Sequence, residues 1–353
     1  MTSRLTENDS SIRRMAASNA VQDTRGRGLR DLRISVIDRC NFRCPYCMPA
    51  DIYGESYEFL RRSEWLTAGE IRRLAGLFQR LGVNKLRITG GEPLLRKDLD
   101  RIIDGLATLE GIDDIALTTN GSRLADRARE LRAAGLKRVT VSVDSIDPAV
   151  FSEMSGGRGD LDSVLAGIDA ARHAGFDVIK LNVAVLKGQN DGSVLDLVEH
   201  FRGSGVIVRF IEFMDVGTLN GWRWDQVVPS RILRDRIHAR WPIEPLEQNY
   251  RGEVAKRYAF ADGKGEIGFI SSVTEPFCGA CHRARLSADG TLYTCLFANM
   301  GTDLRTPLRA GASDADLVAL LQNVWRNRAD RYSEIRGEAM KDSDRVEMYR
   351  MGG

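Results

Sequence analysis

The stretch Asp31-Leu-Arg-Ile-Ser-Val-Ile-Asp-Arg-Cys-Asn-Phe-Arg-Cys-Pro-Tyr-Cys-Met-Pro49 joins an apolar, strand-like run to three closely spaced cysteines. Cys40, Cys44 and Cys47 follow the spacing C-x3-C-x2-C. Thiolates this close together suit a soft metal or an iron-sulfur cluster. A structural zinc site is the alternative, but zinc normally takes four ligands and no fourth Cys or His lies nearby. Three ligands on a four-iron cube would leave one iron open to a small chelating cofactor.

An alternation of strands and helices continues from this stretch. Strand-like apolar runs lie near residues 32–36, 85–89, 115–119, 138–143, 178–185 and 206–213. Helical patterns follow them near residues 98–109, 124–134, 161–174 and 193–202. Thr67 and Glu70 form a capping box for one more helix, which Gly82 ends. The alternation predicts an α/β fold with a parallel sheet, either a partial (β/α) barrel or a doubly wound sheet, and periodicity does not separate the two.

Composition changes at both ends of this regular part. Residues 1–28 lack apolar periodicity, which predicts a flexible N-terminal extension. An organelle transit peptide is the alternative, because Arg4, Arg13 and Arg14 are basic, although acidic residues among them count against it. Residues 29–230 are expected to form the core domain. The alternation stops near residue 230, so residues 231–353 are expected to form a smaller C-terminal region.

This C-terminal region carries a second group of cysteines. Cys278, Cys281 and Cys295 are spaced as C-x2-C-x13-C. A zinc site completed by His282 is one interpretation, and a second iron-sulfur cluster with one free iron is the other. Because all six cysteines of the chain fall into these two groups, isolated buried thiols are a weak explanation.

Charge and hydropathy exclude some classes of function. The 353 residues carry a formal charge of +2, so no global basic field favours nucleic acid or an anionic membrane. The sequence has neither an apolar run of about 18 residues nor a secretory signal, which predicts a cytoplasmic protein with reduced thiols.

Four cations interrupt the apolar strand runs: Arg33, Arg87, Lys180 and Arg209. A buried charge is costly unless it is paired, so these side chains need partners. Separate structural ion pairs are one explanation, and one shared anion, such as a nucleoside triphosphate, is more economical. No GxxxxGK[ST] loop, nucleophile elbow or HExxH motif occurs, so the chemistry is expected to come from cofactors.

The first cysteine motif, with Tyr46 before its last cysteine and Thr89-Gly-Gly-Glu-Pro93 after the second strand, resembles the radical S-adenosylmethionine (SAM) superfamily. From about Leu29 to its end, the chain resembles the GTP 3′,8-cyclases, also called molybdenum cofactor biosynthesis protein A. The segments that carry this resemblance are Arg39–Pro49, Thr118–Gly121, Val141–Ser145, Arg209–Gly217, Phe277–Leu286 and Gly352-Gly353. One departure is His282, where that family usually has Asn.

The resemblance implies a partial (β/α)6 TIM-type barrel, with a smaller C-terminal region that carries a second iron-sulfur cluster. It implies two [4Fe-4S] clusters and SAM as cofactors. The implied reaction converts GTP and SAM to 3′,8-cyclo-7,8-dihydro-GTP, methionine and 5′-deoxyadenosine, in the first step of molybdenum cofactor biosynthesis. A reductant, a cyclic pyranopterin monophosphate synthase that acts on the product, and a homodimer are the partners expected from the family. A peptide-modifying radical SAM maturase is the alternative, although such enzymes usually carry more C-terminal cysteines.

Carried over position by position, the resemblance also implies roles for individual residues. Cys40, Cys44 and Cys47 would hold the SAM-cleaving cluster, and Cys278, Cys281 and Cys295 would hold an auxiliary cluster that faces the guanine. The expected SAM contacts are Tyr46, Gly91, Ser142 and Met214. The expected GTP contacts are Arg33, Arg87, Thr118, Lys180, Arg283, Ala284 and Arg285. Catalytic roles are implied for Arg283, Arg285, Gly352 and Gly353, because the slender Gly-Gly end would reach into the active site.

Overall fold

The computed structural model describes residues 21–339 and 345–352. Within these ranges, no helix combines the length and the apolar character needed to cross a membrane. Gly353, one of the predicted catalytic residues, lies outside the described residues.

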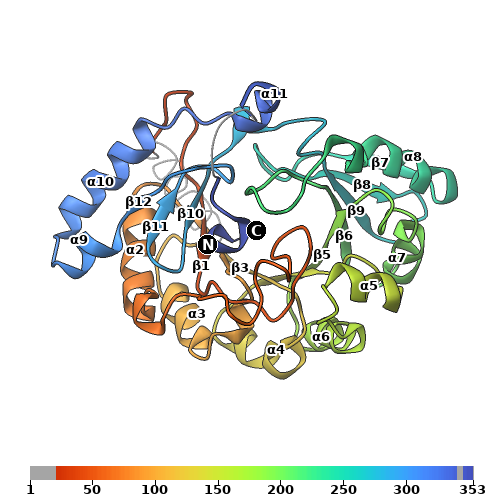
Figure 1. Cartoon of the computed structure of the whole chain (residues 1–353), viewed down its shortest axis with the longest axis horizontal. Coiled ribbons are helices and arrows are strands. Elements are labelled where there is room, and N and C mark those ends of the chain that lie inside the picture. Colours follow the sequence, from red (N-terminus) through yellow and green to blue (C-terminus); the bar gives the residue numbers. More distant parts are fainter. Residues whose placement is uncertain (1–20, 340–344, 353) are drawn as a thin grey trace, which may run out of the picture.

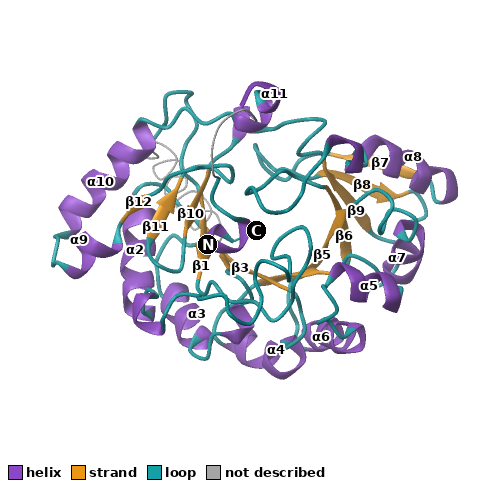
Figure 2. Ribbon diagram, in the orientation of Figure 1, coloured by secondary structure: helices purple, strands orange, loops and turns teal. Residues whose placement is uncertain are grey.

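Six parallel strands form the centre of the structure. They are β1 (Asp31–Ser35), β2 (Lys85–Thr89), β3 (Asp114–Thr119), β4 (Arg138–Ser142), β5 (Val178–Val185) and β6 (Ile207–Glu212). They neighbour one another in chain order from β1 to β6. A doubly wound sheet would instead reverse its strand order at a switch point. The strands curve around a central space with the helices outside, so the fold is a partial barrel (Figures 1 and 2).

Helices connect these strands along the outer face. They are α2 (Ala68–Arg80), α3 (Leu99–Ala107), α4 (Leu124–Ala133), α5 (Pro148–Met154), α6 (Leu161–His173) and α7 (Val194–Phe201). The predicted capping box is confirmed at α2, where Thr67 Oγ1 accepts from Glu70 N at 3.2 Å and Glu70 Oε2 accepts from Thr67 N at 2.7 Å. One helix, α5, was not predicted from the sequence; it is short, and Asp147 caps it.

The core lies between the outer face of the sheet and these helices. Leu32 and Ile34 of β1 and Leu74 of α2 are fully buried, and Phe78 of α2 is 1% exposed. Each side chain of this kind stabilises the fold by roughly 1.5–3 kcal/mol when it is removed from water. Since alternate residues of a strand point to opposite faces, the residues next to Leu32 and Ile34 face the centre of the barrel.

Residues after 230 extend both edges of the same sheet. The added strands are β7 (Ile243–Leu246), β8 (Lys256–Phe260), β9 (Glu266–Ile270), β10 (Arg283–Leu286), β11 (Thr291–Tyr293) and β12 (Thr302–Asp303). β9 pairs in parallel with β6, and β10 pairs in parallel with β1. The remaining helices are α8 (Ser230–Arg240), α9 (Arg305–Arg309), α10 (Asp314–Arg326), α11 (Arg336–Ala339) and α12 (Met348–Met351). This region therefore shares one twelve-stranded sheet with the core and places β10 beside the first strand.

The prediction of a flexible extension over residues 1–28 is wrong for residues 21–28. Gln22 and Gly28 form an antiparallel bridge, Val21 is 7% exposed, and the Arg27 side chain is 2% exposed. The polar composition of this segment hid its packing, because its buried partners come from the far end of the chain. Residues 1–20 lie outside the described residues.

Candidate active site

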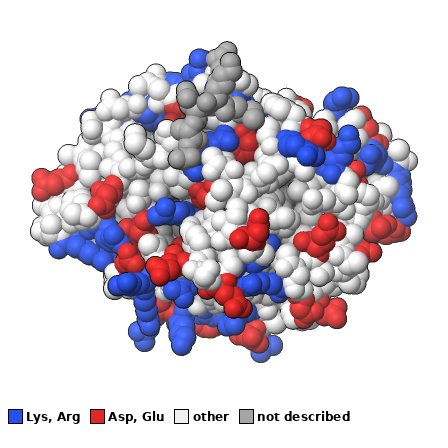
Figure 3. Space-filling model, in the orientation of Figure 1, with Lys and Arg blue, Asp and Glu red and all other residues white. Residues whose placement is uncertain are grey.

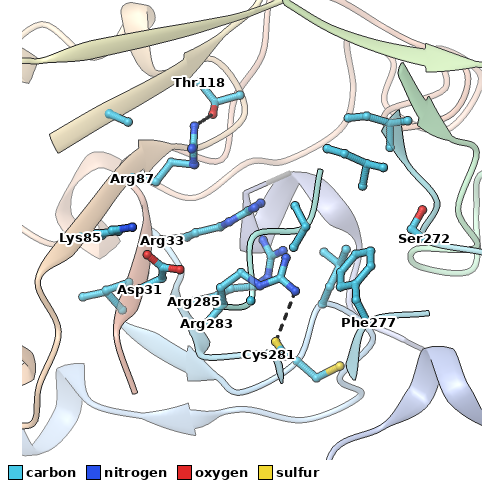
Figure 4. Close-up of a pocket in the computed structure, with 18 of the residues that line it drawn as sticks. Asp31, Arg33, Lys85, Arg87, Thr118, Ser272, Phe277, Cys281, Arg283 and Arg285 are labelled. Atoms are coloured by element: carbon cyan, nitrogen blue, oxygen red, sulfur yellow. Dashed lines mark hydrogen bonds between the residues drawn. The ribbon is translucent and has the colours of Figure 1, made fainter. Parts of the chain in front are cut away.

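Charged side chains form two layers inside the barrel. Strand register aligns Arg285, Arg33 and Arg87 on β10, β1 and β2, and Ala116 and Arg138 continue this layer on β3 and β4. A neighbouring layer holds Arg283, Asp31, Lys85 and Asp114. Layers of inward side chains are the normal filling of such barrels, but they are usually apolar. Here the layers line a cavity instead (Figure 4).

Most arginines of this cavity lack a carboxylate partner. Within the described ranges, no ion pair is formed by Arg33, Arg87, Arg209, Arg283 or Arg285, whereas Arg138 is paired with Asp114. Arg87 Nη1 donates to Thr118 Oγ1 at 3.0 Å, and Arg209 Nη2 donates to Asn182 Oδ1 at 2.7 Å. Neutral acceptors do not cancel the charge of a guanidinium. The cavity is therefore a strongly cationic space inside the molecule.

The pKa directions of Arg33 and Arg209 agree with this excess of positive charge. Burial lowers the pKa of Arg33 well below its usual value, and the charges of Arg285 and Arg87 lower it further. Burial, followed by the charges of Arg87 and Arg138, lowers the pKa of Arg209 to about 9. An anion in the cavity would relieve this repulsion. Figure 3 shows Lys and Arg interspersed with Asp and Glu on the visible surface, so the cationic cluster is a property of the interior.

The predicted GTP-contacting residues do not all line the cavity. Arg33, Arg87, Thr118, Arg283 and Arg285 do. Lys180 does not, although it lies two residues before the lining residue Asn182 on β5 and so faces the same interior side. Ala284 is fully buried in the core on the opposite face of β10.

The cavity also has lining residues that the sequence analysis did not select. Lys85 and Arg138 face inward from β2 and β4, and alternation within the predicted strands could have identified them. Tyr250 comes from the loop between β7 and β8, and its ring lies 3.3 Å from Lys85 Nζ. No sequence pattern predicted that this loop reaches the barrel.

The first cysteine motif lies at the carboxyl end of β1. Cys40 Sγ accepts from the backbone N–H of Phe42 at 3.4 Å and from Asn120 Nδ2 at 3.8 Å. Burial, followed by the charge of Glu92, raises the pKa of Cys40 to about 12. Tyr46, inside the motif, donates its hydroxyl to Asp144 Oδ2 at 2.6 Å. In a (β/α) barrel, this end of the strands carries the chemistry.

The remaining predicted SAM contacts lie at the same end of other strands. Gly91 follows β2, Ser142 ends β4 and Met214 follows β6, and Met214 also lines the cavity. Gly91 has a packing reason to be glycine, since a Cβ there would lie 2.2 Å from the carbonyl oxygen of Arg39. The Gly-Gly pair therefore lets the β2 loop pack against the backbone of the cysteine motif.

The second cysteine group borders the cavity directly. Cys278, Cys281 and Cys295 all line it. Arg283 Nη2 donates to Cys281 Sγ at 3.4 Å, and the Arg283 guanidinium lies 5.2 Å from the centre of the Phe277 ring (Figure 4). Burial acts to raise the pKa of Cys281, but the charges of Arg283 and Arg328 outweigh it and lower the pKa to about 6. His282 points elsewhere, and its Nε2 lies 2.8 Å from the carbonyl oxygen of Arg251.

The C-terminal tail enters the barrel. Arg285 Nη1 donates to the carbonyl oxygen of Gly352. Gly352 has φ 72°, and a Cβ there would lie 2.0 Å from Cγ2 of Thr89. A side chain at this position would therefore meet both an unfavourable backbone conformation and a clash.

Both cysteine groups suit iron-sulfur clusters. Three thiols in each group and N–H donors on the sulfurs are typical of cluster sites. In the part of the chain that the structure describes, no three His, Cys, Asp or Glu side chains are close enough to hold one metal ion. Cysteines around an iron-sulfur cube bind different irons, so they are spaced more widely than the ligands of a single zinc ion.

Comparisons with known proteins agree with this geometry. Two family models match, the Radical SAM superfamily over residues 34–201 and Molybdenum Cofactor Synthesis C over residues 206–334. GTP 3′,8-cyclase of Xanthomonas campestris pv. campestris (strain B100) is 57% identical over 333 residues, which cover 94% of this chain and 97% of that protein. GTP 3′,8-cyclase of Acidothermus cellulolyticus is 55% identical over 320 residues, covering 90% of this chain and 88% of that protein.

A solved structure shares the fold. Streptococcus suis SuiB bound to S-adenosylmethionine superposes with a TM-score of 0.59 at 14% identity, covering 94% of this chain and 72% of that chain. The barrel, the cysteine motif and the first family model define the class as radical SAM enzymes, whose cofactors are SAM and an iron-sulfur cluster. Its identity to the curated relatives shows that the chain belongs to the GTP 3′,8-cyclase family.

Proposed function

We propose that this chain converts GTP and SAM to 3′,8-cyclo-7,8-dihydro-GTP, methionine and 5′-deoxyadenosine, the first step of molybdenum cofactor biosynthesis. One observation carries the proposal beyond family membership. Five arginines without carboxylate partners among the described residues surround a cavity that is also lined by three cysteines. A nucleoside triphosphate would supply the missing negative charge, and the three thiols line the same cavity.

In this proposal, the barrel arginines hold the triphosphate. Arg33, Arg87 and Arg209 offer guanidinium forks that match phosphate oxygens, and Thr118 orients Arg87 through its hydroxyl. Lys180 adds charge from the same interior face. Arg138 contributes less, because Asp114 already neutralises it.

At the open end of the barrel, Cys40, Cys44 and Cys47 would hold a [4Fe-4S] cluster. Tyr46, Gly91, Ser142 and Met214 would contact SAM there. When bound, the reduced cluster supplies the electron that splits SAM and so provides the 5′-deoxyadenosyl radical for the ribose of GTP. The surrounding chain orients GTP and keeps water away from this radical.

At the other side of the cavity, Cys278, Cys281 and Cys295 would hold a second [4Fe-4S] cluster that faces the guanine. Arg283 and Arg285 border this position, and Arg285 also binds the tail at Gly352. We assign catalytic roles to Arg283, Arg285 and the Gly352-Gly353 end. The proposal also includes a cytoplasmic homodimer, an external one-electron reductant and a cyclic pyranopterin monophosphate synthase that takes up the product.

The test is anaerobic incubation of reconstituted protein with SAM, a reductant and GTP, followed by mass analysis. We expect 5′-deoxyadenosine together with a cyclised guanosine triphosphate. Cys40→Ser should abolish both products, whereas Cys281→Ser should abolish the cyclised nucleotide. SAM cleavage that labels a peptide and leaves GTP unchanged would point to a maturase instead.

A further inference from the structure

Two buried arginines lie behind the C-terminal cysteines and share one carboxylate. Arg27 Nε lies 2.6 Å from Asp23 Oδ2, and Arg328 Nη1 lies 3.0 Å from the same oxygen. The side chains of Arg27, Arg328 and Asp23 are 2%, 1% and 0% exposed, respectively. Arg328 also contacts a second carboxylate, with its Nε 3.3 Å from Asp330 Oδ2, so one buried and one half-buried carboxylate neutralise the two arginines. Their other N–H groups still need acceptors, because a buried donor is costly when it is left unsatisfied. The acceptors of those N–H groups therefore indicate what the pair does.

Most of these acceptors belong to the cysteine segments, and one more is the carbonyl oxygen of Asp330, which accepts from Arg27 Nη1 at 2.7 Å. Arg27 Nη1 donates to the carbonyl oxygen of Cys278 at 2.8 Å. Arg328 Nη1 donates to the carbonyl oxygen of Cys281 at 2.9 Å, and Arg328 Nε donates to that of Thr294, the residue before Cys295, at 3.1 Å. Each predicted ligand position is thus held, directly or one residue away, by a charge-assisted hydrogen bond.

A tryptophan of α10 positions the two arginines. Trp325 Nε1 donates to the carbonyl oxygen of Arg27 at 3.0 Å, and the guanidinium of Arg328 lies 4.6 Å from the centre of the Trp325 ring. The ring is 2% exposed. Segments from both ends of the chain therefore pack against each other behind the cysteines.

We propose that Arg27 and Arg328 are positioning residues for the auxiliary cluster. They hold the backbones of Cys278, Cys281 and Cys295 in place, so that cluster binding does not have to order two separate loops. This inference rests on the proposed function, because it assumes that these three thiols ligate a second cluster.

Arginine suits this task better than lysine. Arg27 uses Nε for Asp23 and Nη1 for Cys278, and a planar fork makes both bonds without distortion. A lysine places all its donors on one atom and cannot reach both acceptors in the same way. Nη2 of Arg27 is buried and has no partner within the described ranges. It is therefore an unused donor on a side chain that already contacts the Cys278 backbone, and N–H donors to sulfur are common at cluster sites.

The experiment compares iron retention in the reconstituted full-length protein. Arg27→Lys and Arg328→Lys are challenged with a ferrous chelator, and iron per chain and the EPR spectrum of the reduced protein are followed. Wild type should hold about eight irons, four per cluster. We expect both variants to lose about four of them at least tenfold faster, while the first cluster and SAM cleavage without GTP persist.

Arg257→Lys is the matched control. Arg257 also bonds a carboxylate, Glu266, and a carbonyl oxygen, that of Glu247, but on β8 away from the cysteines. It should retain iron like wild type. Lysine variants that lose iron at the wild-type rate would overturn the inference, whereas a wild type with only about four irons would contradict the second cluster of the proposed function.

Far-UV circular dichroism shows whether the lysine variants are folded. If either lysine variant is unfolded, Trp325→Phe tests the inference instead. This substitution removes the N–H that donates to the carbonyl oxygen of Arg27 but keeps an aromatic ring next to Arg328. We expect it to lose iron from the second cluster severalfold faster than wild type. Unchanged retention in folded Trp325→Phe would then overturn the inference.

Discussion

At the residue scale, Arg33 is a charge inside the barrel whose nearest charged neighbours are mostly other arginines. In the described part of the chain it forms no ion pair, and Arg285 and Arg87 flank it in register on the adjacent strands. A fold under selection for stability alone would place an apolar residue here. An unpaired cation at this position lowers the stability of the fold, and the binding of an anion would explain why it is present.

Replacing Arg33 should therefore separate stability from binding. We expect Arg33→Met to raise the free energy of unfolding by about 1 kcal/mol or more, because it removes an unpaired buried charge. GTP affinity should fall roughly tenfold to a hundredfold. Urea unfolding and titration calorimetry measure the two effects. Arg138→Met is the control and should destabilise the fold, because it leaves Asp114 without its partner. A destabilised Arg33→Met would contradict this account.

If Lys180 contacts the triphosphate, as we propose, GTP binding should be sensitive to pH. Burial, followed by the charges of Arg209 and Arg138, lowers its pKa from 10.5 to about 8. Because the folded-state pKa is the lower one, the unfolded chain binds more protons between about pH 8 and 10.5, and this group's contribution to stability rises with pH there. A triphosphate prefers the charged form, so its affinity should fall as pH rises through about 8.

The measurement is the dissociation constant of GTP in the absence of SAM. It is determined at about equal pH intervals between pH 7 and 9. Lys180→Arg keeps its charge over this range and should remove the decrease in affinity that wild type shows near pH 8. The same decrease in wild type and Lys180→Arg would assign it to another group.

Individual site residues were predictable to different degrees. Arg33 and Arg87 stand out in sequence because they interrupt apolar strands, and the structure places both in the cavity. Arg283 and Arg285 line the cavity together, as their alternation in an extended segment predicts. Tyr250 could not be found in this way, because an irregular loop carries no periodicity that reports its direction.

At the element scale, the short helix α12 is held by an aromatic cluster. The Tyr349 ring centre lies 5.0 Å from that of Tyr53, and the Tyr349 hydroxyl lies 2.6 Å from that of Tyr57. Both partners belong to the loop that follows Cys47. Glu347, just before the helix, accepts from the backbone N–H of Thr218 at 2.8 Å. Four residues cannot form a stable helix alone, so these contacts determine where Gly352 lies.

Weakening the contact of Tyr349 with Tyr53 and Tyr57 should uncouple SAM cleavage from cyclisation. Tyr349→Ala removes a buried ring whose packing is worth about 3–5 kcal/mol, and we expect 5′-deoxyadenosine to form with little cyclised nucleotide. Deletion of Gly352-Gly353 should give the same result with both clusters intact. The ratio of the two products is the measurement.

Tyr349→Phe is the control for the tail. It keeps the ring and loses only the hydrogen bond to Tyr57, which costs about 1 kcal/mol, so coupling should largely persist. Full cyclisation by Tyr349→Ala or by the deletion variant would refute a role for the tail.

At the scale of the whole molecule, Asp215 joins the end of β6 to the C-terminal segment. Its carboxylate, in a residue that is 1% exposed, accepts from Arg336 Nε at 2.8 Å, Arg345 Nη1 at 3.1 Å and the Tyr332 hydroxyl at 2.6 Å. Tyr332 in turn stacks on Phe297, close to Cys295, with ring centres 4.4 Å apart. This one carboxylate therefore links the segment after β6 to the second cysteine group.

Asp215→Asn should lower the free energy of unfolding by about 3 kcal/mol, because it leaves the buried guanidinium of Arg336 and the partly buried one of Arg345 without a counter-charge. Thermal and urea unfolding measure the loss. Asp235→Asn breaks an exposed pair with Arg234 and should change stability by less than about 1 kcal/mol. Equal effects of the two substitutions would show that the Asp215 cluster is not a structural centre.

The sequence by itself determined the six strands, most of the connecting helices and the two cysteine groups. Strand alternation, helical periodicity and capping are local properties, so a short window contains all the information they need. The class of chemistry was also accessible, because closely spaced cysteines report metal binding without a fold.

Only the tertiary structure decided how the two ends of the chain complete the barrel. Parallel pairing of β10 with β1, the packing of residues 21–28 behind the second cysteine group and the entry of Gly352 beside Arg285 all join segments far apart in sequence. Such contacts depend on the sum of many weak interactions across the whole chain. No local pattern encodes that sum, which is why Arg27 and Arg328 resemble surface charges in sequence and lie fully buried in the fold.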